Sequence, residues 1–337
     1  MDAIRFTAFR MSDRTSADRR RSLLAALAYF DLFDYPLTLV ELGRFRYRFP
    51  GDGAGTSAHA DILDGLDTPA VGTRDGYYFL AGREAIVEVR KRRYRLAEKK
   101  FARARRIVRA LRYLPSVRYA AVCNSLALSN ADKESDIDLF IVVRHGFLWI
   151  TRLFVAGMLA ALRLRPTGAS HADKVCLSFF LSERTLDLSR LALEPDDTYL
   201  RYWIATLVPL YDADGLHARL LGANAWVAER LPGSGATDAG QQRAFAPPRF
   251  AFAAALPLFG ALEPAARRFQ MRMFPAEISG MANLDSRVLV SDDILKFHVN
   301  DRRAHFERLF REKLREFGLA EQKTKTTTYR LQPTTCP

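Results

Sequence analysis

Two aspartates at close spacing are the most chemically informative residues in the sequence. Asp136 and Asp138 lie two residues apart in the segment SDIDLFIVV, whose remaining residues are mostly apolar. Because side chains alternate between the two faces of a β-strand, both carboxylates should project from one face, about 7 Å apart along the chain. Two carboxylates at this spacing repel each other unless a cation lies between them. Since oxygen ligands suit Mg²⁺ and Mn²⁺, the pair predicts a divalent metal site.

The residues before this pair are suited to binding phosphate. The apolar segment VRYAAVC ends at Asn124 and Ser125, and a short polar loop then leads to Asp136. Where a strand turns into a helix, backbone N–H groups and a hydroxyl can bind the phosphates of a nucleotide. We therefore expect Asn124 and Ser125 to contact a triphosphate next to the metal.

The whole stretch AVCNSLALSNADKESDIDLFIVV resembles the Gly-Ser and Asp-x-Asp signature of nucleotidyltransferase domains of the DNA polymerase beta superfamily. The resemblance implies metal-dependent transfer of a nucleoside monophosphate from an NTP to a hydroxyl of an RNA, protein or small-molecule acceptor. Asp136 and Asp138 would be the catalytic residues and the metal ligands. Where the family pattern has glycine, this chain has Asn124, so the turn must be made by a residue that tolerates left-handed backbone geometry.

The same resemblance implies a third carboxylate on the neighbouring strand. The strand expected over KVCLSFFL places Cys176, Ser178 and Phe180 on one face, and none of them is acidic. Asp173 and Glu183 flank this strand and are the candidates to substitute. The missing acid supports an alternative hypothesis, in which a catalytically degenerate nucleotidyltransferase-like protein acts as a nucleic-acid-binding regulator or an interaction module.

Residues 1–82 predict a winged-helix-like module. Apolar residues recur at helical spacing early in this region, and Thr38 with Glu41 forms a capping-box pair at the start of a second helix. Three short helices followed by a hairpin are typical of winged helices, which contact either nucleic acid or protein. The expected elements are helices over 22–33, 38–45 and 59–66 and a hairpin over 71–80 that turns at residues 74–76.

A strongly basic segment follows over residues 83–113. Between Arg83 and Arg112 there are thirteen Lys or Arg against three Glu, with no Pro or Gly, so we expect one long linking helix. The chain of 337 residues carries 51 Lys and Arg against 38 Asp and Glu, a net charge of +13. This excess favours a polyanionic partner, with RNA favoured among nucleic acids, and the alternative is a solvated helix face. As acceptors, RNA and a protein side chain are both preferred over a small molecule.

The overall expectation is an α/β (α+β) fold. Residues 114–190 should form a small mixed-sheet nucleotidyltransferase core, and residues 191–337 a helical C-terminal region with a flexible loop over 231–248. Near the end, the segment from Leu295 to Arg303 gathers His, Asn, Asp and two Arg. It either supplies cations to the triphosphate or starts an amphipathic helix that is capped by Asn300 or Asp301.

Cysteine usage and hydropathy predict a cytoplasmic protein. Cys123, Cys176 and Cys336 are widely spaced and form no CxxC pair, so neither a disulfide framework nor a zinc site is indicated. The apolar stretches over 147–162 and 250–262 are too short or too interrupted for a membrane span, and Pro257 is expected to break the second. Both stretches are expected to form buried helices, and a location at a membrane surface is the alternative for the second. Motifs of P-loop ATPases, dehydrogenases, α/β-hydrolases and zincins are not found.

Overall fold

The computed structural model describes residues 2–52, 59–166, 171–235, 244–248 and 256–319. The chain divides into two compact units, and the unit boundaries within described elements fall in α4 (Ile86–Leu111), η2 (Ala225–Glu229) and α11 (Arg303–Glu316). Unit 1 comprises Met1–Arg92, Trp226–Ala236 and His305–Thr326, and unit 2 comprises Arg93–Ala225, Thr237–Ala304 and Thr327–Pro337.

The described part of unit 1 contains the predicted helices and hairpin in the predicted order. The first helix begins earlier than expected, and a short strand precedes the second helix and pairs with the hairpin. The sheet of three described strands is antiparallel, in the order β1-β3-β2. The elements are α1 (Asp2–Asp31), β1 (Leu37–Thr38), α2 (Leu39–Phe45), α3 (His59–Leu66), β2 (Val71–Arg74) and β3 (Tyr77–Leu80).

Local sequence signals explain two features of unit 1. The predicted capping box forms at the start of α2, because Glu41 N–H donates to Thr38 Oγ1 at 3.3 Å and Thr38 N–H donates to Glu41 Oε2 at 2.8 Å. The β2–β3 turn has positive φ at Asp75 and Gly76, as a tight hairpin requires. The core of this unit includes Phe30, whose ring packs on Phe45 with centroids 5.1 Å apart.

The described strands of unit 2 form one mixed sheet of six strands in the order β7-β4-β5-β6-β9-β8. Only β5 and β6 pair in parallel, and the other described neighbours are antiparallel. A mixed α/β architecture is therefore confirmed. The strands are β4 (Val117–Val122), β5 (Ile137–Val143), β6 (Val175–Ser182), β7 (Val208–Asp212), β8 (Val288–Val290) and β9 (Ile294–Phe297).

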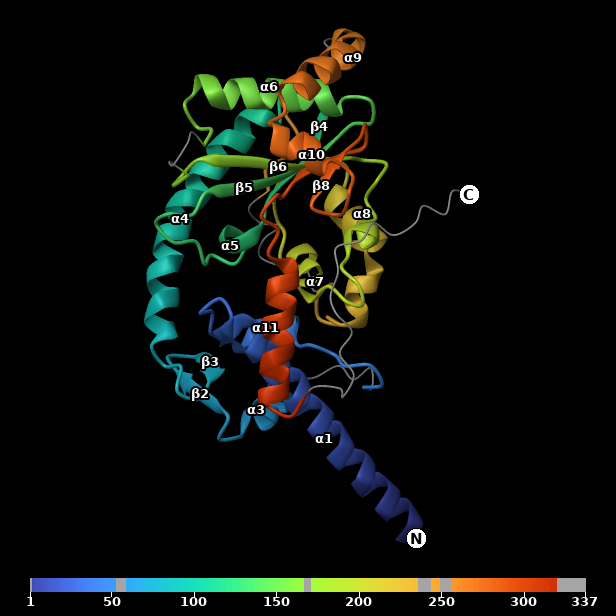
Figure 1. The fold of residues 1–337 in the computed structure, drawn as a ribbon. Coiled ribbons are helices and arrows are strands. Elements are labelled where there is room, and N and C mark those ends of the chain that lie inside the picture. The colour runs from blue at the N-terminus through green and yellow to red at the C-terminus, as the bar shows by residue number, and fades with distance from the viewer. Residues whose placement is uncertain (1, 53–58, 167–170, 236–243, 249–255, 320–337) are drawn as a thin grey trace. The chain divides into compact units, whose positions relative to one another are not determined.

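Helices cover both faces of this sheet. On one face, buried residues of α4 and α6 (Leu148–Ala161), among them Phe101 and Trp149, pack with Ile141 of β5 in one apolar core. On the other face, Trp203 of α7 (Thr198–Ala205) lies against Phe140 of β5, with ring centroids 5.2 Å apart. Figure 1 shows α6 and α7 on opposite sides of β5 and β6. Alternate residues of β5 therefore pack against helices on opposite faces of the sheet.

The prediction of mainly helical sequence after residue 190 is wrong at three strands. β7, β8 and β9 are only three to five residues long, and each completes the sheet by pairing with a neighbour that local sequence does not indicate. β7 contains Pro209, which weakens its strand signal but is tolerated at the edge of a sheet. The remaining elements are η1 (Ser189–Leu191), α8 (Leu216–Ala223), η2 (Ala225–Glu229), α9 (Leu256–Met273) and α10 (Ala276–Met281).

Two further expectations concern the segments around α9. Pro257 does not break the helix, because it lies in the first turn of α9, where its missing N–H is not needed. Of the loop expected over 231–248, residues 236–243 lie outside the described residues, as do residues 250–255 of the second apolar stretch. In the part of the chain that the structure describes, no helix is long and apolar enough to cross a membrane.

Candidate metal centre

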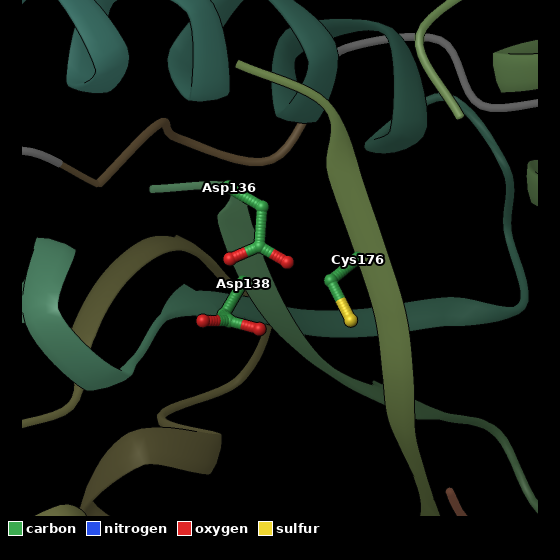
Figure 2. A group of neighbouring side chains, drawn as sticks. All are labelled: Asp136, Asp138 and Cys176. Carbon is green, nitrogen blue, oxygen red and sulfur yellow. The ribbon is translucent and has the colours of Figure 1, made fainter. Parts of the chain in front are cut away.

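Asp136, Asp138 and Cys176 come together at one end of β5 and β6 (Figure 2). Asp136 directly precedes β5, Asp138 is its second residue, and Cys176 pairs with Asp138 from β6. One carboxylate oxygen of each aspartate and Cys176 Sγ all lie within 4.8 Å of one another. Among the described residues this is the one such group of three potential ligands, so the two aspartates that the sequence singled out do share a site.

The electrostatics of the pair favour a cation. Burial, and then the charge of Asp136, raise the pKa of Asp138 from 3.8 to about 6. Burial also raises the pKa of Asp136, which the nearby Lys100 and His171 partly counteract. The two carboxylates are therefore costly to keep ionised side by side, and a divalent ion between them would offset that cost.

Asn124 supports Asp138 directly. It starts the four-residue helix α5 (Asn124–Ala127) with a φ of +56°, the left-handed conformation expected where the family pattern has glycine. Its side-chain amide Nδ2 donates to Asp138 Oδ2 at 2.8 Å. Asparagine at this turn therefore both adopts the required backbone geometry and orients a candidate metal ligand. Ser125, the next residue, is half-buried, and its carbonyl accepts a 2.8 Å hydrogen bond from Asn130 N–H.

The loop that leads into Asp136 is fixed by two sets of contacts. Lys100 of α4 is only 4% exposed, and its Nζ donates to the carbonyl of Ser135 at 2.7 Å and to that of Lys133 at 3.3 Å. Within the loop, Ser135 N–H donates to Asp132 Oδ1 at 2.8 Å, and Asp132 N–H donates to Ser135 Oγ at 3.0 Å. The basic helix α4 therefore helps to fix the loop that positions Asp136.

Neither of the acids proposed as a third carboxylate joins the pair. Asp173 Oδ1 accepts from Lys100 Nζ at 2.8 Å, and its other carboxylate oxygen lies 3.6 Å from Arg103. Glu183 lies 3.3 Å from Arg118 at the far end of β6. The third position is instead taken by Cys176. The sequence predicted that Cys176 lies on this face of the strand, but it was not predicted as a ligand because an acidic residue was expected there.

A bulge in β6 corrects one detail of that face. Asp138 pairs with Cys176 and Phe140 pairs with Phe179, so β6 holds one more residue than β5 over this interval. As a result Phe179, not Phe180, follows Cys176 and Ser178 on the site face, and Phe180 turns into the opposite core. The predicted grouping of Phe180 with Cys176 and Ser178 is therefore wrong.

A hydrogen-bonded pair continues the site face beyond Cys176. Ser178 Oγ lies 2.9 Å from His298 Nε2, and burial lowers the pKa of His298 to about 3, so its imidazole is neutral at neutral pH. Burial and the charge of Asp138 raise the pKa of Cys176 to about 12. Without a metal ion the third group is therefore a neutral thiol.

The segment after His298 leads into a helix, which was the second of the two predicted alternatives. Asp301 accepts from Arg303 N–H at 3.0 Å, where α11 begins. The Arg303 guanidinium is buried and already bound to Asp197, at 2.6 Å, and to Asp301, at 2.9 Å. Its charge is thus compensated within the fold. Lys296 joins the same network through Asp301, at 3.2 Å.

The donor set fits a divalent cation of intermediate softness. Two carboxylates suit Mg²⁺ and Mn²⁺, which complete their coordination with water and substrate phosphates. A thiol is a softer ligand, which binds as the thiolate and favours Mn²⁺ or Zn²⁺ over Mg²⁺. Asp136 and Asp138 would hold the ion, and Cys176 would bias which ion is held.

In comparisons with known proteins, no family model matches this chain, and no match is found among curated proteins or among solved structures.

Proposed function

We propose that this chain is a metal-dependent nucleotidyltransferase that moves a nucleoside monophosphate from an NTP to an acceptor hydroxyl. The observation that supports the proposal best is the convergence of Asp136 and Asp138, with Asn124 on a left-handed turn donating to Asp138. A strand, a tight turn, a polar loop and a second strand with two acids on one face are the parts that such a site requires.

Each residue has a distinct role in the proposed reaction. Asp136 and Asp138 hold Mg²⁺ or Mn²⁺, and Asn124 orients Asp138. Ser125, beside that turn, binds the triphosphate through its hydroxyl. When bound, the cation neutralises charge on the triphosphate and on the leaving pyrophosphate. The acceptor oxygen forms a bond to the α-phosphorus, the bond to the bridging oxygen breaks, and the hydroxyl proton is released to solvent.

The acceptor that best suits the site is RNA. α4 contacts the site loop through Lys100, and Lys99, Arg106 and Arg109 of the same helix are exposed. Tyr94, also exposed on α4, offers a ring on which a base can stack. Backbone phosphates neutralised by these side chains would give binding that weakens steeply with salt.

The direct test is incubation of the purified protein with Mg²⁺ or Mn²⁺, α-labelled NTPs and cellular RNA or protein. The proposal expects label on a macromolecule, lost in Asp136→Ala and Asp138→Ala. Glu134→Ala, at an exposed loop residue close by, is the matched control and should label normally. Equal labelling and equal NTP binding by wild type and both aspartate variants would reject the proposal.

A second candidate function is favoured by the occupied third position. Cys176 stands where an acid was expected, and Asp173 and Glu183 are engaged by Lys100 and Arg118. We propose as the alternative a nucleotidyltransferase-like protein that binds a nucleotide without turning it over. Such a protein would act as a nucleic-acid-binding regulator or an interaction module.

The first unit supports both candidates. Its order of α1, β1, α2, α3, β2 and β3 is that of a winged-helix-like module, which either docks an acceptor or contacts nucleic acid itself. NTP binding without turnover of any NTP, together with salt-dependent nucleic-acid binding by the full chain, would favour the alternative. Metal-dependent labelling would exclude it.

A further inference from the structure

The orientation of α9 is fixed by polar contacts with α6. Glu263 accepts backbone hydrogen bonds from Trp149 and Ile150 at the start of α6, both at 2.8 Å. Gln270, two turns further along α9, donates to the Trp149 carbonyl at 2.7 Å and accepts from Arg152 at 2.7 Å. The side of α9 that carries Glu263, Ala266 and Gln270 therefore faces α6, and Figure 1 shows the two helices together.

A second side of α9 is apolar and exposed. Leu258 is 62% exposed, Leu262 44%, Phe269 51% and Met273 65%. With exposed Ala265, these residues recur every three or four positions, so they form one stripe along the helix. We call them the α9 stripe. On α6, Phe154 is 48% exposed and its ring contacts Phe259, which extends this apolar surface. A contiguous exposed surface of this kind marks an interaction site.

The charged side chains that border the α9 stripe on the side away from α6 are both positive. Arg268 and Arg272 each precede a stripe residue, are exposed, and border the stripe on the side away from α6. Glu263 is the single acidic residue of α9, all of whose residues the structure describes, and it is turned toward α6. Nothing acidic on α9 therefore opposes an anionic partner.

We propose that the α9 stripe binds the surface of an anionic phospholipid bilayer, with Leu258, Leu262, Phe269 and Met273 inserted at the level of the headgroups. Helices that lie in the interface combine large apolar side chains on one side with Arg or Lys next to them, as α9 does. The arginines would contact lipid phosphates while the apolar side chains leave water. The inference does not depend on the proposed nucleotidyl transfer.

A vesicle flotation assay with the full-length protein tests the inference. The two vesicle types are pure phosphatidylcholine and phosphatidylcholine with about 30% phosphatidylglycerol. The wild type should float with the anionic vesicles, about tenfold more strongly than with the neutral ones, and high salt should release it. Phe269→Asp and Leu258→Asp should each reduce this binding about tenfold, and Arg268→Gln with Arg272→Gln should weaken it on anionic vesicles only.

Val40→Asp is the matched control, because Val40 is a similarly exposed apolar residue, at 68%, on a different helix. It should bind like wild type. All variants change exposed side chains, so circular dichroism should show the wild-type helix content for each of them. The inference is overturned if the wild type does not float, or if Val40→Asp loses as much binding as Phe269→Asp. It is also overturned if Phe269→Asp instead abolishes concentration-dependent self-association, which would assign the stripe to a second copy of the chain.

Discussion

Asn124 holds Asp138 through a 2.8 Å hydrogen bond from the side-chain amide, and it does so from a backbone with a φ of +56°. One residue therefore makes the turn after β4 and fixes a candidate metal ligand on β5. Because of this double role, substitution of Asn124 by alanine and by glycine should have different effects on stability.

Asn124→Ala should be more harmful than Asn124→Gly. Both lose the hydrogen bond to a carboxylate, but only alanine also pays for the left-handed backbone, which costs about 1 kcal/mol. We expect the free energy of unfolding to fall by about 2 kcal/mol in Asn124→Ala and by about 1 kcal/mol in Asn124→Gly, as measured by urea denaturation. Equal losses in the two variants would show that the backbone conformation contributes nothing.

The pKa of Asp138 predicts a pH dependence of stability without metal. Because this pKa is raised from 3.8 to about 6, the folded state binds the proton more tightly than the unfolded chain does. Stability should therefore fall as pH rises from 3.8 to about 6 and stay low above that range. Urea midpoints in EDTA should show this dependence for wild type and a weaker one for Asp138→Asn.

A bound divalent ion should restore the stability that the protein loses when Asp138 ionises. A divalent ion competes with the proton on Asp138, so Mn²⁺ should raise the thermal midpoint more at pH 7.5 than at pH 5. In Asp138→Asn the shift should be small at both values. A Mn²⁺ shift that is equal at the two pH values in the wild type would place the binding site elsewhere.

Cys176 should determine metal preference. Cys176→Ser replaces a soft ligand with a hard one of similar size, so the ratio of Mn²⁺ to Mg²⁺ affinity should fall about tenfold in titration calorimetry. Cys176→Asp supplies the third carboxylate that the family resemblance implies, and it should tighten Mg²⁺ binding. If neither variant changes either affinity, Cys176 is not a ligand.

The buried ion network around Arg303 should be important for stability. Asp197→Ala would leave the Arg303 guanidinium short of a partner and remove the N-terminal cap of α7. Removing one member of a buried pair costs about 3–5 kcal/mol, so we expect a large fall in the urea midpoint. Glu312→Ala, which breaks an exposed pair with Arg308 in α11, should cost no more than about 0.5 kcal/mol.

Sequence alone predicts those parts of the site that depend on neighbouring residues. The spacing of Asp136 and Asp138 within an apolar run is enough to predict β5 and a shared face, because strand periodicity is local. The left-handed conformation of Asn124 agrees with what the family resemblance implied, because the family pattern has glycine at this turn. Thr38 and Glu41 likewise predict the start of α2.

The parts that sequence did not predict depend on distant pairing. Cys176 becomes the third potential ligand through the register of β6 on β5, including a bulge that no local signal marks. Asp173 does not join the site and instead binds Lys100, which lies 73 positions earlier in the chain. The short strands β7 and β9 are recognisable only from their partners β4 and β6. Tertiary contacts outweigh weak local preferences at each of these places.

The most direct test of the central claim is anomalous diffraction at the manganese edge, from crystals grown with Mn²⁺ and a non-hydrolysable NTP analogue. The account predicts an anomalous peak between the Asp136 and Asp138 carboxylates, with Cys176 Sγ beside it and the triphosphate extending toward Ser125. A nucleotide bound without any peak at these residues, or a peak at another part of the chain, would contradict it.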